Sequence, residues 1–287
     1  MKIGVIYPQI EMKGDPEAVR RFALAAEQLG YDHLIAYDHV LGAVHEGREP
    51  PLTGPYTEKH PFHDPFTMFS YLAGLTTRLE LVSGVIILPQ RQTALVAKQA
   101  ADLALFSNNR FRMGVGLGWN WVEYDALGQD FHTRGKRMEE QVALLRRLWS
   151  EPVVSFDGRF DHIDRASLSL FPTKPVPIWF GGFSEPAWRR AGRLADGFLF
   201  GGPLEAANAG WAVVKASMEE AGRDPETFGR EYMYGTPTGD ADKIADAFKT
   251  WRDAGGTHAS VATMGRGFEG VDAHIGFIED VRRKVEG

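Results

Sequence analysis

The chain has 287 residues, of which 44% are hydrophobic and 24% are charged, a composition typical of a globular protein with a large core. Its net charge of −6 argues against a nucleic-acid partner, because phosphate binding needs a concentrated excess of Lys and Arg. The absence of cysteine excludes disulfides, thiolate nucleophiles, Fe–S clusters and Cys-ligated zinc.

The first ten residues, MKIGVIYPQI, lead directly into a predicted strand at 3–8 without a signal-peptide pattern. Further along, no window approaches the roughly 18 apolar residues of a membrane span. We therefore expect a cytoplasmic protein. Asp15, Pro16 and Glu17 then predict the N-cap and first turn of a helix that Gly30 closes.

The second predicted strand, 31–39, ends in YDHV and so places Asp38 and His39 at its C-terminal end. Residues 41–64 follow, rich in Pro and Gly and without a helical or alternating pattern. A connection this long inside a compact fold is usually a lid, a binding loop or disordered. We interpret it as a lid over a site that His39 faces.

Residues 79–119 predict one βαβ unit. The strand at 79–88 is almost wholly apolar or small, as in a parallel sheet covered on both faces. The strand at 111–115 runs into Gly116-Leu117-Gly118, where a ligand can approach bare backbone. Between them, a helix carries its apolar stripe on Ala94, Ala97, Ala101, Leu103, Leu105 and Phe106.

The rest of the chain continues the alternation of strands and helices. A hairpin around Asp157-Gly158 interrupts it within 151–170. Further strands are predicted at 177–182, 197–202, 228–235 and 258–264, each followed by a helix. Eight strands predict an α/β protein with a single (β/α)8 barrel domain over 1–287, with insertions after strand 2 and before strand 5. A doubly wound open sheet is the alternative.

Glycine pairs stand at the C-terminal ends of three of these strands: Gly116 and Gly118, Gly181 and Gly182, and Gly201 and Gly202. Each pair alone could merely ease a tight turn. Together with Ser184 at a helix N-terminus, the three favour an anionic group such as a phosphate tail, held by backbone N–H groups rather than by Lys or Arg.

His39 is the best-placed acid–base residue, since an imidazole exchanges protons near neutral pH. The structural alternative is a histidine that only hydrogen-bonds Asp38 or a carbonyl. Aromatic side chains that could wall a flat ring are Tyr37, Phe62, Trp119 and Trp121.

Other motif hypotheses fail. His60 and His63 lack a convincing third ligand, so we expect no metal site. Gly114-x-Gly116-x-Gly118 lacks the spacing of a dinucleotide fingerprint, and the chain has no G-x-S-x-G, Walker lysine or H-E-x-x-H motif.

Five segments together resemble the bacterial luciferase-like family of flavin- and deazaflavin-dependent oxidoreductases, and they cover nearly the whole chain. They are YDHV at 37–40, SGVIILPQRQTALVAKQAADLALFSNNRFRMGVGLGWN at 83–120, FHTRGKRMEEQVALLRRLW at 131–149, PIWFGG at 177–182 and ADGFLF at 195–200. The resemblance implies a (β/α)8 barrel, commonly dimeric, that binds FMN or coenzyme F420 at its C-terminal mouth.

Residue by residue, the resemblance implies that the third strand backs the cofactor ring, with a non-prolyl cis peptide at Gly84-Val85. His39, with Asp38, matches the family's active-site histidine segment. The other cofactor contacts implied are Gly116, Gly118, Trp119, Gly181 and Gly182.

One position departs from the family. Sugar-phosphate dehydrogenases of the F420 branch place a glutamate just after the glycines, where this chain has Trp119. Activity on glucose 6-phosphate is therefore not expected, and a small apolar or aromatic substrate is favoured. From the family resemblance we expect an F420-dependent hydride transfer to or from that substrate, in a homodimer. The alternatives are an FMNH2-dependent monooxygenase using O2 and a non-catalytic cofactor-binding barrel.

Overall fold

The computed structural model describes residues 1–286. Its main sheet is parallel, in the order β3-β2-β1-β11-β10-β9-β8-β5-β4, and pairing of β3 with β5 closes it into a barrel. The strands are β1 Lys2–Ile6, β2 His33–Ala36, β3 Glu80–Ser83, β4 Ile86–Ile87, β5 Phe111–Gly116, β8 Ile178–Gly181, β9 Gly197–Phe200, β10 Gly229–Tyr234 and β11 His258–Ala262. Because β3 and β4 are two pieces of one barrel strand, the eight-stranded barrel is confirmed and the open sheet is wrong.

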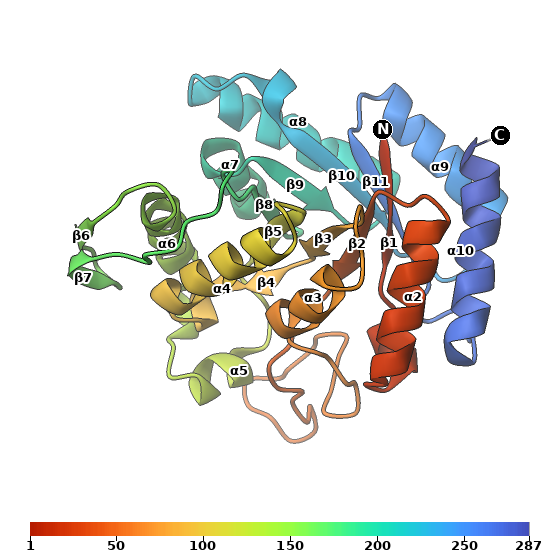
Figure 1. Cartoon of the computed structure of the whole chain (residues 1–287), viewed down its shortest axis with the longest axis horizontal. Coiled ribbons are helices and arrows are strands. Elements are labelled where there is room, and N and C mark those ends of the chain that lie inside the picture. Colours follow the sequence, from red (N-terminus) through yellow and green to blue (C-terminus); the bar gives the residue numbers. More distant parts are fainter. Residues whose placement is uncertain (287) are drawn as a thin grey trace.

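Helices surround the barrel (Figure 1). The longer ones are α2 Pro16–Gln28, α3 Pro65–Ala73, α4 Thr93–Phe106, α6 Arg134–Leu148, α7 Glu185–Leu194, α8 Leu204–Glu220, α9 Ala241–Asp253 and α10 Gly270–Glu286. Short elements are α1 Gln9–Met12, α5 Trp121–Ala126 and the 3-10 turns η1 Leu88–Gln90, η2 Phe131–Thr133 and η3 Pro225–Thr227. Asp15 caps α2 as predicted, since its side chain accepts a hydrogen bond from the Glu17 N–H.

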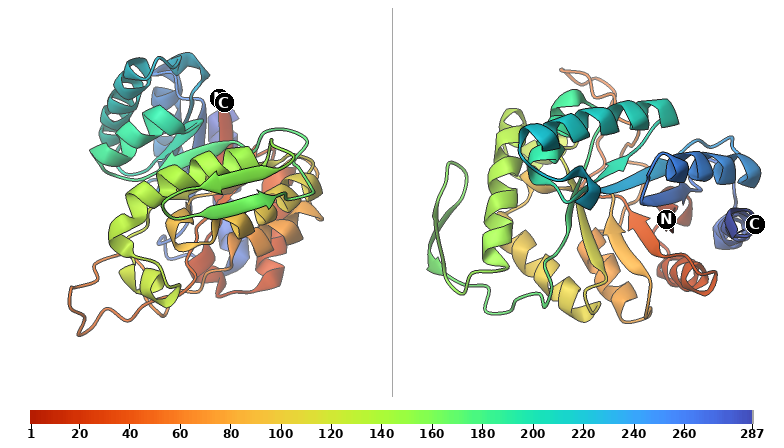
Figure 2. Two further views of the ribbon diagram at one scale, coloured as in Figure 1. Left: turned by 90° about the vertical axis from the view of Figure 1, so that its left-hand side faces the viewer. Right: turned by 90° about the horizontal axis from the view of Figure 1, so that it is seen from above.

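Both predicted insertions are present. The 37–64 connection after β2 contains no strand or helix and lies beside α5 (Figure 1), where Leu41 bonds Glu123 and Asn120. The second insertion is the antiparallel hairpin of β6 Val154–Asp157 and β7 His162–Ala166, which lies outside the barrel beside α6 (Figure 2).

Both faces of the barrel strands are buried, as their apolar sequences predict. One set of alternate residues packs in the barrel interior, including Ile6, Ile35, Val82, Trp179, Leu199 and Ala262. The intervening residues, such as Val5, Leu34 and Leu81, pack in a separate cluster with helical residues. The two-residue period of a strand therefore divides the core into an interior and a shell.

Two local predictions need correction. Strand β2 ends at Ala36 rather than at residue 39, because the Tyr37 N–H and C=O bond the side chain of Gln9 and leave the sheet. In α4, Phe106 is 69% exposed and Ala94 is also exposed. The buried face of this helix follows Val96, Ala97, Ala100, Ala101, Leu103 and Ala104 instead.

None of the helices within residues 1–286 combines the length and the apolar character that crossing a membrane would require.

Candidate active site

A cavity of about 640 Å³ opens where the barrel strands end. Its lining brings together residues from four connections, including the one that contains the 41–64 loop and the β8–α7 turn. The catalytic and cofactor-binding candidates chosen from sequence all lie in this lining: Asp38, His39, Gly84, Val85, Gly116, Gly118, Trp119, Gly181 and Gly182. Of the four aromatic candidates, Tyr37 and Trp119 line the cavity, whereas Phe62 and Trp121 do not. Gly201 and Gly202, the third glycine pair, do not line it.

Val85 and two glycines form part of the cavity wall. A Cβ atom at Gly116 would lie 2.5 Å from the Val85 side chain, and one at Gly181 would lie 2.8 Å from it. Only glycine at both positions therefore leaves room for Val85 between β5 and β8. The Gly84–Val85 peptide is cis, which confirms the expectation from the family resemblance.

Asp38 is 3% exposed, and its carboxylate is already engaged. It accepts hydrogen bonds from the Ile87 N–H at 3.0 Å and from Arg91 at 2.7 Å. Arg91 also reaches Asp64, at 3.0 Å, at the far end of the 41–64 loop. Burial raises the pKa of Asp38, whereas Arg91 acts to lower it. Asp38 thus links β4, through Ile87, to the end of the loop, through Arg91. A contact between Asp38 and a cofactor stays a prediction.

His39 lies just beyond β2, in an aromatic enclosure. Its Nδ1 is 3.3 Å from Glu123 Oε2, so its partner is neither Asp38 nor a carbonyl. Within residues 1–286, its Nε2 makes no hydrogen bond. The ring meets three aromatic rings edge-on, with centroid distances of 5.3 Å to Tyr56, 4.9 Å to Phe62 and 5.6 Å to Trp119.

The 41–64 loop covers the cavity on the His39 side, as the lid interpretation predicts. Residues 53–56 of the loop line the cavity. Gly54 packs so closely against the Trp119 indole that no side chain would fit there. The loop is braced internally by a hydrogen bond of 3.0 Å between His45 Nε2 and the Tyr56 carbonyl.

Two residues of the site escaped the sequence reasoning. One is Glu123, the buried partner of His39. The other is Arg134, the Lys or Arg side chain that lines the described part of the cavity. The expectation that backbone N–H groups hold an anion there stays a prediction. An arginine in the first turn of a helix opposes the helix dipole, and this was the available signal.

Arg134 is held with part of its guanidinium unpaired. Its Nη1 donates to the Phe131 carbonyl at 2.7 Å, and the group lies 3.7 Å from the centre of the Phe131 ring. The buried Nε has no hydrogen-bond partner within residues 1–286. Arg134 can therefore still bind an anion.

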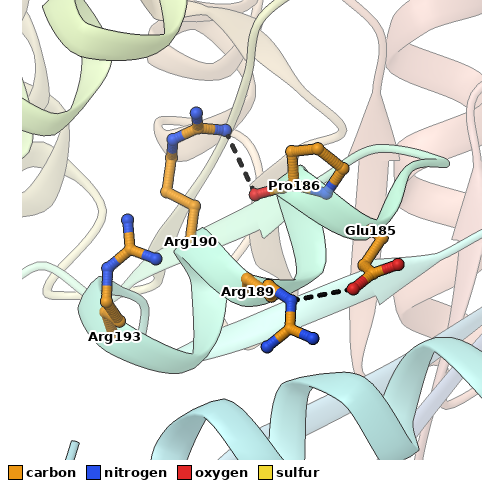
Figure 3. Close-up of a pocket in the computed structure, with 5 residues that line it drawn as sticks. All are labelled: Glu185, Pro186, Arg189, Arg190 and Arg193. Atoms are coloured by element: carbon orange, nitrogen blue, oxygen red, sulfur yellow. Dashed lines mark hydrogen bonds and ion pairs between the residues drawn. The ribbon is translucent and has the colours of Figure 1, made fainter.

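A second hollow, of about 390 Å³, lies on α7 and is rich in arginine (Figure 3). These arginines are paired with carboxylates: Arg189 with Glu185 at 2.8 Å, and Arg190 and Arg193 with Glu139 at 2.8 and 3.1 Å. Their charge is thus locally compensated, which favours the barrel cavity as the candidate site.

Comparison with known sequences finds a matching family and several similar proteins. The family described as luciferase-like monooxygenase matches residues 4–238. An uncharacterized protein of Mycobacterium tuberculosis is 37% identical over 208 residues, which cover 70% of this chain and 71% of that protein. The F420-dependent glucose-6-phosphate dehydrogenase of Nakamurella multipartita is 29% identical over 187 residues, 64% of this chain and 52% of that enzyme.

Solved structures share the fold over the full length. An F420-dependent secondary alcohol dehydrogenase in complex with an F420–acetone adduct superposes with a TM-score of 0.81 at 18% identity, covering 99% of this chain and 98% of that one. The monooxygenase RslO1 from Streptomyces bottropensis gives 0.79 at 18% identity, covering 100% and 99%. With the family matched over most of its length, the chain belongs to the luciferase-like monooxygenase family.

Proposed function

We propose that this protein is an oxidoreductase that uses coenzyme F420 to pass a hydride to or from a small organic substrate, with His39 as the acid–base group. Family membership and the F420-dependent relatives support the proposal. The observation that carries it is His39, whose Nε2 makes no hydrogen bond within residues 1–286 and whose ring lines the cavity.

The cavity fits a flat ring that carries an anionic tail. Val85 packs over Gly116 and Gly181 and forms the wall on which the ring would rest. Ser184, the N-cap residue of α7, makes no side-chain capping bond, so its hydroxyl and the Glu185 N–H can meet a phosphate together with Arg134. When bound, the deazaflavin ring supplies the hydride chemistry, and the protein supplies position and electrostatics.

His39 would move the proton that accompanies the hydride. A histidine within hydrogen-bond reach of a substrate oxygen can take or give that proton near neutral pH. The aromatic rings around His39 exclude water from the same region. Acid–base assistance of this kind typically contributes about 10²–10⁴-fold to the rate.

The substrate that fits the cavity is apolar or aromatic. Tyr56, Trp119 and Met233 line it, and Arg134 is the single Lys or Arg among the described lining residues. If Arg134 binds the cofactor tail, no cation in this lining is left for a sugar phosphate. We therefore expect turnover of apolar or aromatic alcohols or carbonyl compounds and none of glucose 6-phosphate, measured as a change in F420 absorbance.

Cofactor binding tests the proposal directly. Oxidised and reduced F420 and FMN are each titrated into the purified protein, and quenching of cofactor fluorescence is followed. We expect binding of F420 in the micromolar range and none of FMN. Binding of FMN but not of F420 would favour the monooxygenase alternative, which neighbours such as the EDTA monooxygenase of Chelativorans represent in this fold.

Arg134→Gln tests the placement of the tail. We expect F420 affinity to fall about tenfold, as for loss of a charge-assisted hydrogen bond. Affinity for a deazaflavin without its phosphate-bearing tail should not change. Equal weakening of both ligands would show that Arg134 acts on the cavity as a whole.

The proposal extends to the number of domains, the cellular location and the oligomeric state. We propose one domain over 1–287, a cytoplasmic location and a homodimer. Exposed apolar side chains on neighbouring helices support the association of two copies: Tyr71 and Leu75 on and after α3, and Leu95 and Phe106 on α4. Light scattering coupled to gel filtration should give twice the chain mass of 31.9 kDa.

A further inference from the structure

Glu123 is a buried carboxylate in α5 that contacts three consecutive residues at the cavity mouth. It is 1% exposed. Its Oε1 accepts hydrogen bonds from the Val40 N–H at 2.7 Å and the Leu41 N–H at 3.0 Å. Its Oε2 lies 3.3 Å from His39 Nδ1. No Lys or Arg within residues 1–286 pairs with it, so these donors are what compensates its burial.

The chemistry of the pair fixes which ring nitrogen of His39 carries the proton. An ionised carboxylate only accepts hydrogen bonds, and two backbone N–H groups already stabilise the ionised form of Glu123. Nδ1 must therefore be the donor in this contact. In a neutral imidazole the other nitrogen, Nε2, then has a lone pair instead of a proton. The neighbouring aromatic rings of His39 offer no competing anionic acceptor.

The same element also holds the start of the 41–64 loop. Asn120 donates from Nδ2 to the Leu41 carbonyl at 3.1 Å, while its Oδ1 caps α5 through the Val122 N–H. The backbone at Leu41 is thus bonded on its N–H side by Glu123 and on its C=O side by Asn120. One short helix sets both the orientation of His39 and the entry of the loop.

We infer that Glu123 is a positioning residue for the proposed reaction: it holds His39 in the Nδ1–H tautomer, so that Nε2 takes the substrate proton in the oxidative direction and returns it in the reductive one. In the oxidative direction the carbinol C–H bond breaks, with its electron pair leaving as hydride to the proposed cofactor. The O–H proton goes to Nε2, and the C=O bond forms. The role in proton transfer rests on the proposed function, whereas the tautomer of His39 does not.

A purely structural role is the competing explanation, and the chain offers matched controls for it. Glu140 on α6 accepts from the backbone N–H groups of Arg159, Phe160 and Asp161, at 2.8 to 2.9 Å, and so holds the hairpin insertion. Like Glu123, it fixes a loop through backbone donors, but none of its hydrogen-bond partners within residues 1–286 is a histidine. A variant at Glu140 therefore reports the effect of loosening a loop alone.

Glu123→Gln separates the two roles. The glutamine oxygen can still accept from Val40 and Leu41, so the loop keeps its attachment. Its NH2 group would then face Nδ1 as a donor, and His39 would have to accept there and carry its proton on Nε2. A structural role predicts no change in the ring, whereas the inferred role predicts an inverted tautomer.

The experiment records 15N spectra of the histidine side chains in the cofactor-free protein, at a pH where the His39 ring is seen to be neutral. His39 is one of nine histidines and is assigned by the signals that vanish in His39→Asn. We expect a protonated Nδ1 in the wild type and in Glu140→Gln, and a protonated Nε2 in Glu123→Gln. A protonated Nε2 in the wild type overturns the inference even if the variant does not fold, and so does an unchanged tautomer in folded Glu123→Gln.

Turnover and binding supply the second readout. If the tautomer matters, Glu123→Gln should lower the turnover number by about 10²-fold or more, within the range of acid–base assistance, and leave F420 affinity within about twofold. Because the tautomer is measured without cofactor, failure of F420 to bind would refute the proposed function and leave the tautomer result standing. An inverted tautomer with unchanged turnover would overturn the catalytic part of the inference.

Discussion

The two ends of the barrel each contain a histidine paired with a glutamate, and the two pairs differ in what surrounds them. At the N-terminal end, His33 Nε2 lies 2.5 Å from Glu231 Oε1, and both side chains are fully buried. Glu231 also binds Arg112 at 2.7 Å, and Arg112 reaches Glu80 at 3.2 Å. At the C-terminal end, His39 contacts Glu123 beside an open cavity.

In the N-terminal network each charge has a nearby partner. Burial alone would raise the pKa of Glu231, but His33 and Arg112 hold it below its ordinary value. The Arg112 guanidinium also lies 4.1 Å from the centre of the Trp179 ring. His33 also has a ring nitrogen, Nδ1, without a hydrogen bond, but that atom is buried. His39 lines the open cavity, and its Nε2 makes no hydrogen bond in the described chain. The two histidines therefore differ in whether they border a cavity, and not in whether a ring nitrogen lacks a partner.

Glu231→Gln should break the stabilising network and give the largest effect. The substitution keeps the shape of the side chain but leaves Arg112 with a single carboxylate partner in the barrel. Removing one partner of a buried ion pair costs about 3–5 kcal/mol in the free energy of unfolding. Urea denaturation measures the loss. The same change at Glu151, exposed beside Arg147, should leave the curve in place, and equal curves for Glu231→Gln and the wild type would refute the role of the network.

His39→Asn should lower turnover strongly and the free energy of unfolding only slightly. The asparagine Nδ2 can replace Nδ1 as donor to Glu123, but the nitrogen that faces the cavity is lost. We expect turnover to fall about 10²–10⁴-fold, and the free energy of unfolding to fall by only about 1 kcal/mol. Steady-state kinetics and urea denaturation of the same preparation measure both. A loss of stability as large as that of Glu231→Gln would show that the His39–Glu123 pair stabilises the fold as much as the His33–Glu231 pair does, and would contradict the comparison.

The barrel fold and the end of the barrel that holds the cavity could be predicted from the sequence. Apolar strands alternating with amphipathic helices gave the barrel, and the glycines after β5 and β8 pointed to its C-terminal mouth. The cis peptide at Gly84–Val85 came from family resemblance rather than from periodicity. Local pattern carries this information because strand burial and turn chemistry are properties of neighbouring residues.

The pairings themselves could not be predicted. His39 and Glu123 are separated by 84 positions in the sequence, and Arg112 and Glu231 by 119. The residues next to each of them in the sequence do not indicate which distant residue it will contact. Asp38 shows the same limit: its position beside the site was predicted, but its engagement by Arg91 depends on how β2 and η1 pack. Which atom of a polar side chain stays available is decided by three-dimensional contacts alone.

The N-terminal end should also contribute to a loss of stability in acid. Burial and Arg112 lower the pKa of His258, at the N-terminal end, from 6.5 to about 3. The unfolded chain therefore binds this proton as the pH falls below 6.5 and the folded chain does not until about pH 3, so stability is lost across that window. We expect the free energy of unfolding to be about 1–2 kcal/mol lower at pH 5 than at pH 7.

His258→Gln checks the assignment of this slope. Urea denaturation of the variant should show a smaller difference between pH 7 and pH 5. Because burial also lowers the pKa of His274, part of the slope should remain. An unchanged difference would mean that His258 gains its proton in the folded protein as readily as in the unfolded one.

Asp64→Asn should give the smallest effect, confined to the cavity end. Asparagine still caps α3 through the Thr67 N–H, so the substitution removes only the ion pair with Arg91. Since Asp64 is 37% exposed, the pair contributes less than about 1 kcal/mol. Amide hydrogen exchange at 53–56 should therefore quicken by up to about fivefold, while β10 and β11 exchange as before. If exchange at 53–56 stays the same, the ion pair between Asp64 and Arg91 does not help to hold the loop over the cavity.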